Sequence, residues 1–167
     1  MSELTVRDRR PDDDDAILRI NAANVPEVGP MDATKLEALA AEAAWLPVAV
    51  LDGSIVGFAI FLTEGAEYAS PNYRWFGGRN PRFFYVDRIA LAEACRGQGL
   101  GQRLYRTAVD LACAGDRPVF CAEVNTIPPN PTSMRFHERF GFEDVARLSP
   151  YDPDSEVAML EFRVPPA

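Results

Sequence analysis

The glycine-rich segment Arg96-Gly97-Gln98-Gly99-Leu100-Gly101 constrains this sequence more than any other feature. It follows an apolar run, Phe83 to Leu91, and it precedes apolar residues at helical spacing. A strand is therefore expected to pass through a tight turn into a helix. The first backbone N–H groups of a helix have no intrahelical partner, and glycines let such a backbone come close to a ligand. The turn is thus predicted to bind an anion, most commonly a phosphate.

The composition is that of a soluble globular protein. Of the 167 residues, 47% are hydrophobic and 25% are charged, which predicts a single domain spanning residues 1–167. No apolar stretch is as long as a membrane span, and the polar N-terminus does not resemble a secretion signal. We therefore expect a cytoplasmic protein that binds no membrane. The net charge of −8 argues against a nucleic-acid partner, and the three cysteines lack zinc-site spacing, so no metal is expected.

The order of strand and helix patterns predicts an α/β fold. Strands are expected at residues 4–7, 46–51, 54–62, 83–91, 118–124, 142–148 and 156–164, and helices at 12–24, 33–43, 100–113 and 131–140. Asp52-Gly53 lies between two apolar runs and predicts a hairpin with a tight primed turn. Asp32 is placed to cap the second helix. These patterns together predict a mixed central sheet of about seven strands with about four helices.

The segment 64–81 is long for a connection in a compact domain, and it is predicted to be a loop. It carries four aromatic residues, Tyr68, Tyr73, Trp75 and Phe76, so disorder is not expected. Its aromatic side chains either pack on the core or form a wall of a substrate site, because binding residues concentrate on loops that a scaffold holds.

Two charges, Asp87 and Arg88, interrupt the apolar run that precedes the glycine turn. Neighbouring residues of a strand point to opposite faces of the sheet. Each charge is therefore expected to find a partner elsewhere, because an unpaired buried charge is costly. A structural ion pair is favoured over a direct role in chemistry.

Two segments together resemble the GNAT superfamily of N-acetyltransferases. Arg96, Gly99 and Gly101 match the family motif Arg/Gln-x-x-Gly-x-Gly/Ala. The segment 130–142, Asn-Pro-Thr-Ser-Met-Arg-Phe-His-Glu-Arg-Phe-Gly-Phe, is similar to the family segment Asn-x-x-Ala/Ser-x-x-Phe/Leu-Tyr-x-x-x-Gly-Phe. The spacing between the two motifs also agrees. The segments 24–30 and 70–76 resemble a bacterial subgroup of the family that has no assigned acceptor.

The resemblance implies acetyl-CoA as the acetyl donor. In the family, the two central parallel strands splay apart and the pantetheine arm of the cofactor lies between them. The residues expected to bind the cofactor are Ile89, Ala90 and Leu91 on the strand, Arg96, Gly97, Gln98, Gly99, Leu100, Gly101 and Gln102 around the pyrophosphate, and Asn130, Ser133 and His137 in the second motif.

The resemblance also suggests catalytic residues for direct acetyl transfer to an amine. Glu123 matches the position of a catalytic glutamate in related ribosomal-protein acetyltransferases, and its apolar neighbours would raise its pKa toward that of a useful base. Alternatively, Glu123 faces solvent or pairs with an arginine. His137 replaces the tyrosine that usually protonates the departing sulfur, and it either keeps that role or only packs or contacts CoA. Tyr105, Tyr151 or a tyrosine of 64–81 could also supply the proton.

The acceptor is expected to be an amine of a small molecule or a peptide, and a homodimer would be common for the family. Tyr73, Arg74 and Trp75 are the candidate acceptor wall, since an arginine suits a carboxylate and aromatic rings suit a cation or an apolar group. A different hypothesis is a catalytically silent acyl-CoA-binding sensor of the same fold. A nucleotide phosphate loop is not favoured, because Gly-Lys-Ser/Thr is missing and the glycine spacing is not that of dinucleotide sites.

Overall fold

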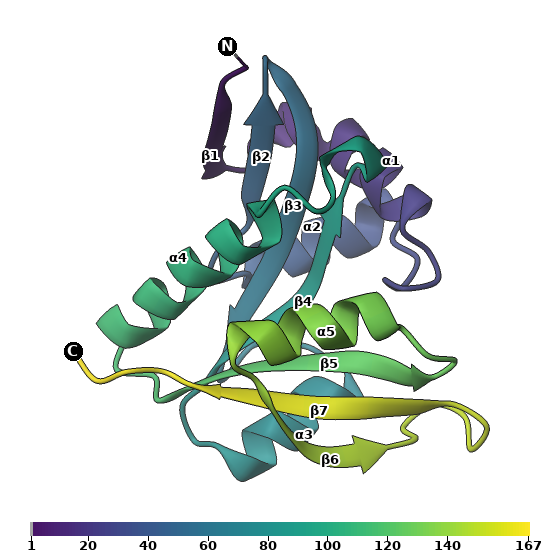
Figure 1. The fold of residues 1–167 in the computed structure, drawn as a ribbon, viewed down its shortest axis with the longest axis vertical. Helices are drawn as coiled ribbons and strands as arrows, with labels where there is room; N and C mark the ends of the chain where they lie inside the picture. The colour runs from purple at the N-terminus through teal and green to yellow at the C-terminus, as the bar shows by residue number, and fades with distance from the viewer. Residues whose placement is uncertain (1) are drawn as a thin grey trace. The chain divides into compact units, whose positions relative to one another are not determined.

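The structure is a computed structural model that describes residues 2–167. In this part of the chain there are seven strands and five α-helices (Figure 1). The strands are β1 (Leu4–Asp8), β2 (Pro47–Leu51), β3 (Ser54–Thr63), β4 (Phe84–Leu91), β5 (Val119–Ile127), β6 (Glu143–Leu148) and β7 (Glu156–Arg163). The helices are α1 (Asp14–Ala23), α2 (Ala33–Glu42), α3 (Pro71–Arg79), α4 (Leu100–Ala114) and α5 (Pro131–Phe140), with short 3-10 helices at Pro11–Asp13 and Glu93–Cys95.

The strands hydrogen-bond in the order β1-β2-β3-β4-β5-β7-β6. Strands β4 and β5 are parallel, with Phe84 opposite Phe120 and Tyr85 opposite Cys121. The pairs β1–β2, β2–β3, β5–β7 and β6–β7 are antiparallel. The predicted α/β fold with a mixed sheet of seven strands is therefore confirmed.

The predicted loop at 64–81 is wrong, because helix α3 lies within it and brings the number of helices to five. The Ser70 side chain caps this helix by accepting a hydrogen bond from Tyr73 N at 3.3 Å. Pro71 occupies the first turn, where its missing N–H costs nothing. The pair Ser70-Pro71 is thus a helix-start signal that the surrounding aromatic and glycine residues obscured.

The chain divides into two compact units. The first comprises the residues up to Leu62 together with Val86–Leu104, and the second comprises Thr63–Tyr85 and Tyr105–Ala167. The single domain expected from composition stays a prediction. Each unit has its own buried residues.

The first unit contains the hairpin and the helix cap that the sequence predicts. Asp52 and Gly53 join β2 to β3 with φ of 49° and 82°, as a tight primed turn requires. The Asp32 side chain accepts a hydrogen bond from Lys35 N at 2.8 Å and so caps α2. The unit buries Ile17 of α1 and Leu36 of α2 completely. Both helices therefore contribute an apolar face to its core.

The charges on β4 pair with each other, contrary to the expectation of separate partners. Arg88 Nε lies 2.8 Å from Asp87 Oδ2, and each side chain is only 4% exposed. The long side chain of arginine lets its guanidinium reach the neighbouring carboxylate although the two residues leave the strand on opposite sides. Arg88 Nη1 also donates to Asn21 Oδ1 at 3.0 Å and to Gly29 O at 2.9 Å. The pair therefore joins β4 to α1 and to the segment that follows it.

In the second unit, the two faces of β4 and β5 pack against different helices. Tyr85 contacts the rings of Tyr73 and Phe76 from α3, with centroids 5.5 and 5.9 Å apart. Phe120 contacts the Tyr105 ring of α4 at 5.0 Å. Because successive strand residues alternate between faces and Tyr85 pairs with Cys121, Phe120 lies on the face opposite to Tyr85. One face therefore packs on α3 and the other on α4.

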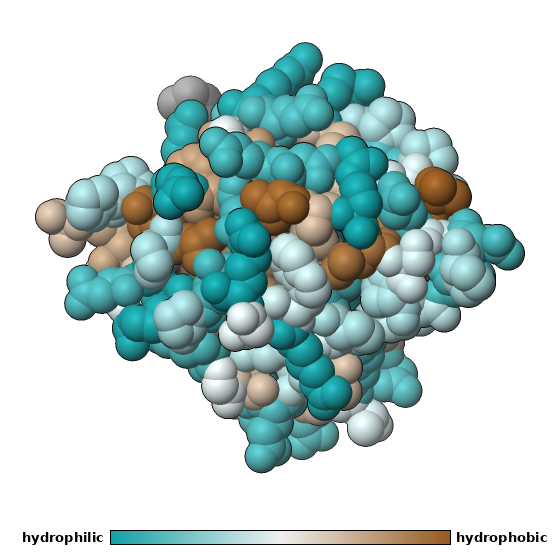
Figure 2. Space-filling view, turned by 90° about the horizontal axis from the view of Figure 1, so that it is seen from below, coloured by the Kyte–Doolittle hydropathy of each residue, from teal (hydrophilic) through white to brown (hydrophobic). Residues whose placement is uncertain are grey.

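The face of the molecule drawn in Figure 2 carries mostly polar side chains. Figure 2 shows hydrophobic side chains on one face as separate patches among hydrophilic ones. In residues 2–167, none of the helices has the length and hydropathy needed to cross a bilayer.

Substitution Asp87→Ala is expected to lower the free energy of unfolding by about 3 kcal/mol, because it leaves the buried Arg88 guanidinium without its carboxylate. Chemical denaturation measures this loss. The control is Asp32→Ala, which removes only an exposed helix cap and should cost about 1 kcal/mol. Equal losses in the two variants would contradict a buried ion pair that supports the first unit.

Candidate active site

The glycine turn of the first unit is open and presents unpaired backbone N–H groups. Gly97 and Gly99 have φ of 75° and 81°, and a Cβ at either position would meet nothing within 4 Å. The first helical hydrogen bond runs from Arg103 N to Gly99 O at 3.1 Å. The N–H groups just before Arg103 therefore lack helical acceptors, and an anion can take their place. This geometry fits a pyrophosphate group.

The turn is held by residues on both sides of it. The Gln98 side chain donates to Ala94 O at 2.9 Å, within the short helix that follows β4. Arg96 Nη2 donates to Asn24 Oδ1 at 2.7 Å. The same Asn24 side chain donates to Leu91 O at 3.1 Å. Asn24 therefore links the end of α1 to both sides of the turn, a role that its sequence position does not reveal.

The predicted strand residues lie on the part of β4 that belongs to the first unit. Ala90 is buried, whereas Ile89 and Leu91 are half-buried. A Cβ at Gly57 of β3 would lie 3.2 Å from Ala90 O and 2.7 Å from the Leu91 side chain. Gly57 thus permits the close approach of β3 to this end of β4. Binding of cofactor by these three residues stays a prediction.

In the second unit, Asn130 and Ser133 lie at the start of α5. The Asn130 side chain accepts a hydrogen bond from Ser133 N at 3.3 Å, and Pro131 occupies the first turn. Asn130 is therefore the N-cap of this helix. This structural role explains the asparagine without any ligand, and its predicted contact with cofactor stays a prediction.

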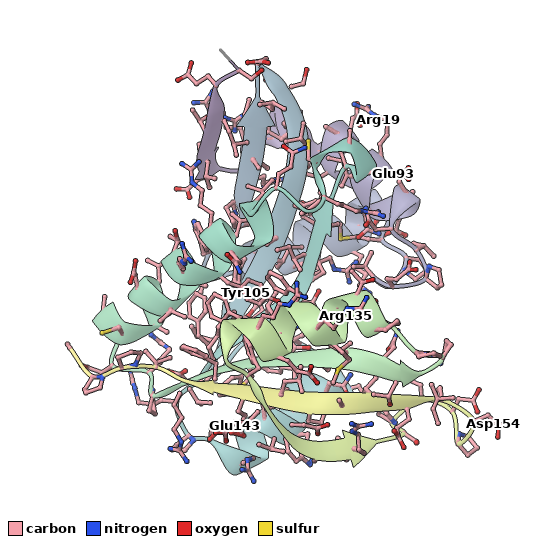
Figure 3. All side chains as sticks on the ribbon, in the orientation of Figure 1. Arg19, Glu93, Tyr105, Arg135, Glu143 and Asp154 are labelled. Atoms are coloured by element: carbon pink, nitrogen blue, oxygen red, sulfur yellow. The ribbon has the colours of Figure 1, made fainter. Side chains whose placement is uncertain are left out.

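His137 lies in the core of the second unit rather than at an open site. It is 4% exposed, and its ring packs on Phe136 and Phe142 at centroid distances of 5.2 and 5.0 Å. Its Nδ1 lies 2.8 Å from Ser133 O, and since a carbonyl oxygen only accepts, this nitrogen carries the hydrogen. Nε2 therefore accepts from the Tyr105 hydroxyl at 2.9 Å, and Tyr105 projects from α4 toward α5 (Figure 3).

Burial also removes the charge that a proton donor would need. Loss of solvation lowers the pKa of His137 to about 4, although the hydrogen bond to Ser133 opposes the shift. The imidazole is therefore neutral near pH 7, with its one N–H directed to a backbone oxygen. Burial likewise raises the pKa of Tyr105 above its usual range. The geometry supports the alternative of a packing histidine over the proton donor considered above.

Glu123 lies on β5 and accepts a hydrogen bond from a tyrosine. The Tyr85 hydroxyl is 2.8 Å from each carboxylate oxygen of Glu123. Glu123 is half-buried, whereas Tyr85 is completely buried. Its apolar neighbours on the strand, Cys121, Ala122 and Val124, are buried as expected. Glu123 thus keeps partial access to solvent beside a hydrogen-bond donor.

The two predicted catalytic residues lie on opposite faces of the sheet of the second unit. Glu123 is two residues beyond Cys121 and shares the α3 face with Tyr85. His137 contacts Tyr105, which packs on Phe120 of the other face. The structure therefore does not bring Glu123 and His137 together as an acid–base pair.

The three residues of the predicted acceptor wall have different environments on α3. Tyr73 is 5% exposed, and its hydroxyl donates to Thr63 O at 2.5 Å. It therefore belongs to the core of the second unit, which corrects its place in an open wall. Arg74 is exposed and Trp75 is half-buried. Trp75 also stacks with the Arg79 guanidinium, 5.8 Å from the ring centroid.

The stability of the protein is expected to fall by about 2 kcal/mol between pH 7 and pH 5 because of His137. The unfolded chain takes up a proton near pH 6.5, whereas the folded chain does so only near pH 4, so acidification favours unfolding in this window. Urea denaturation at both pH values measures the change. In His137→Phe this loss should largely disappear, and an equal loss in both proteins would contradict a buried, neutral imidazole.

Comparison of the sequence with known protein families identifies a matching family. The family model described as Acetyltransferase (GNAT) family matches residues 15–142, which is more than half of the chain. Acetyltransferase Atu2258 from Agrobacterium fabrum (strain C58) is 32% identical over 81 residues, covering 48% of this chain and 56% of that protein. The match therefore spans about half the length of this relative.

Solved structures share the fold. Ard1 from Thermoplasma volcanium superposes with a TM-score of 0.78 at 23% identity and covers 96% of this chain and 97% of its own. The putative acetyltransferase yncA from Salmonella typhimurium, solved with its cofactor acetyl-CoA, has a TM-score of 0.72 at 19% identity. The match covers 99% of this chain and 96% of the yncA chain. With the family model matching most of the sequence, the chain belongs to the acetyltransferase (GNAT) family.

Proposed function

We propose that this protein is an acetyl-CoA-dependent N-acetyltransferase that moves an acetyl group directly to an amine of a small molecule or a peptide. The observation that carries the proposal is the open glycine turn, where a Cβ at Gly97 or Gly99 would meet no atom within 4 Å. Family membership supports the same cofactor. Bound acetyl-CoA would supply an acetyl group activated as a thioester.

The turn suits the pyrophosphate of this cofactor chemically. Backbone N–H groups from Gly97 to Gln102 would donate to phosphate oxygens, and the positive end of the α4 dipole adds to the attraction. Ile89, Ala90 and Leu91 of β4 would contact the cofactor arm through the backbone. At the start of α5, Asn130 and Ser133 are the proposed cofactor contacts, whereas the burial of His137 argues against a direct one.

Glu123 is the proposed general base. An amine that reaches the enzyme as an ammonium must lose a proton before its nitrogen can attack a carbonyl carbon. The Glu123 carboxylate keeps partial solvent access and is held by the Tyr85 hydroxyl. A fixed carboxylate of this kind can accept the ammonium proton. The exposed Arg74 and the half-buried Trp75 remain the proposed contacts for the rest of the acceptor.

Substitution Gly99→Val should weaken CoA binding by about tenfold or more, because a β-branched residue resists φ near 81° and obstructs the approach of phosphate. Isothermal titration with CoA measures the dissociation constant. Gly53→Val is the matched control, since Gly53 has φ of 82° and open surroundings but lies in the β2–β3 turn. Loss of CoA affinity in both variants, or in neither, would contradict a phosphate site at Gly99.

Substitution Glu123→Gln should lower turnover by about a hundredfold or more and abolish the acidic limb of the pH–rate profile, with CoA affinity unchanged. The measurement is CoA release against a panel of polyamines, amino acids and peptides with free amino termini. An unchanged rate and profile would show that Glu123 is not the base. Tight CoA binding without turnover on any amine would instead favour the silent acyl-CoA sensor.

A further inference from the structure

The contact between Tyr85 and Glu123 is unusual because one hydroxyl serves both oxygens of a carboxylate. Both O···O distances are 2.8 Å. A phenol has a single proton to donate, so the hydrogen bond is shared between the two oxygens. This geometry places the Tyr85 hydroxyl opposite the carboxyl carbon of Glu123, at the same distance from both oxygens.

The strand register creates this contact. Tyr85 pairs with Cys121 in the parallel ladder, and Glu123 follows two residues later on the same face. The Tyr85 side chain thus reaches along the sheet to the carboxylate on the neighbouring strand. Its ring is completely buried and touches Tyr73 and Phe76 of α3. The hydroxyl therefore has little freedom to move away from Glu123.

This arrangement has a chemical consequence for the carboxylate. A hydrogen bond donated to a carboxylate stabilises the ionised form, whereas partial burial disfavours it. Charge-assisted hydrogen bonds are also about twice as strong as neutral ones, and they hold the acceptor in a narrow range of orientations. Without the hydroxyl, the half-buried Glu123 carboxylate would lose this stabilisation of its ionised form, and Tyr85 would no longer restrict its orientation.

We infer that Tyr85 is a positioning residue that holds the Glu123 carboxylate ionised and oriented for proton removal from the acceptor ammonium. The inference rests on the proposed function of Glu123 as the base. In the proton transfer, one ammonium N–H bond breaks and one O–H bond forms on Glu123, which later releases this proton to solvent. Tyr85 keeps its own proton throughout and acts only through the carboxylate.

The alternative is a purely structural role for Glu123, in which its carboxylate only accepts the hydrogen bond of the buried Tyr85 hydroxyl. The buried Tyr73 hydroxyl shows that backbone groups can also bond such a hydroxyl, because it donates to Thr63 O and accepts from Ala66 N at 2.9 Å. Loss of either hydroxyl would destabilise the second unit. Loss of the Tyr85 hydroxyl would in addition remove the hydrogen bond to Glu123.

The test compares Tyr85→Phe with Tyr73→Phe, which removes a hydroxyl from the same aromatic cluster without touching Glu123. Carbon-detected NMR follows the Glu123 carboxyl signal through a pH titration, with Glu123→Gln as the assignment reference. We expect the midpoint to rise by about one pH unit in Tyr85→Phe and to stay near the wild-type value in Tyr73→Phe. The pH–rate profile, measured with the most active amine of the panel, should show the same shift of its acidic limb and about a tenfold loss of kcat at pH 7.

The outcomes separate this inference from the function on which it rests. An unchanged midpoint in Tyr85→Phe would overturn the positioning role, even if Glu123→Gln is inactive. A shifted midpoint with an unshifted acidic limb would overturn it as well, since Tyr85 would then matter only for structure. If Glu123→Gln is fully active, the base assignment fails, and the positioning role fails with it for that separate reason.

Discussion

The unpaired N–H groups at the start of α4 are the feature on which the proposed chemistry depends. They arise because a helix cannot satisfy its own first donors, and Gly97 and Gly99 hold the chain at positive φ just before that helix. A Cβ at either glycine would meet no atom within 4 Å, so the positive φ is the constraint on these two positions. The Arg96–Asn24 hydrogen bond then ties this turn to the end of α1. The glycine turn, which is the proposed anion site, is thereby held by contacts within one unit.

In the second unit, the alternation of side chains on β4 and β5 places Glu123 and His137 on opposite faces of the sheet. One face carries the aromatic cluster around Tyr105, Phe120 and His137. The other face carries Tyr85 and Glu123 beside α3. Because adjacent residues of a strand face opposite sides, Phe120 can belong to the core while Glu123 remains half-buried. A half-buried carboxylate therefore lies only three residues from a fully buried phenylalanine.

Both units bury charged or titratable side chains, and Arg88 and His137 each have specific partners. Arg88 pairs with Asp87 and also donates to Asn21 and Gly29 O. His137 is neutral and bonds to Tyr105 and to Ser133 O. These partners are needed because an isolated buried charge or an unsatisfied donor is costly. The single histidine of the chain thus becomes part of the core, although its residue type suggested a proton donor.

Local patterns in the sequence were sufficient for much of the fold. The Asp52-Gly53 hairpin, the Asp32 cap and the glycine turn each depend on residues within a few positions of one another, and the order of strand and helix patterns was enough to predict a mixed α/β sheet. Helix α3 was missed because its start signal, Ser70-Pro71, lies in a segment whose length and aromatic content suggested a loop. Local propensity and spacing therefore determined the framework and the position of the anion site.

The environment of the functional side chains was decided by tertiary contacts. Tyr85 and Glu123 are 38 residues apart, Tyr105 and His137 are 32 apart, and Asn24 and Arg96 are 72 apart. Residue type alone indicates that a histidine can titrate or that a glutamate can act as a base. Burial and hydrogen-bond partners decide whether it does so, and both come from segments that the fold brings together. The sequence therefore located the candidate site, whereas packing set the protonation state of His137 and the orientation of Glu123.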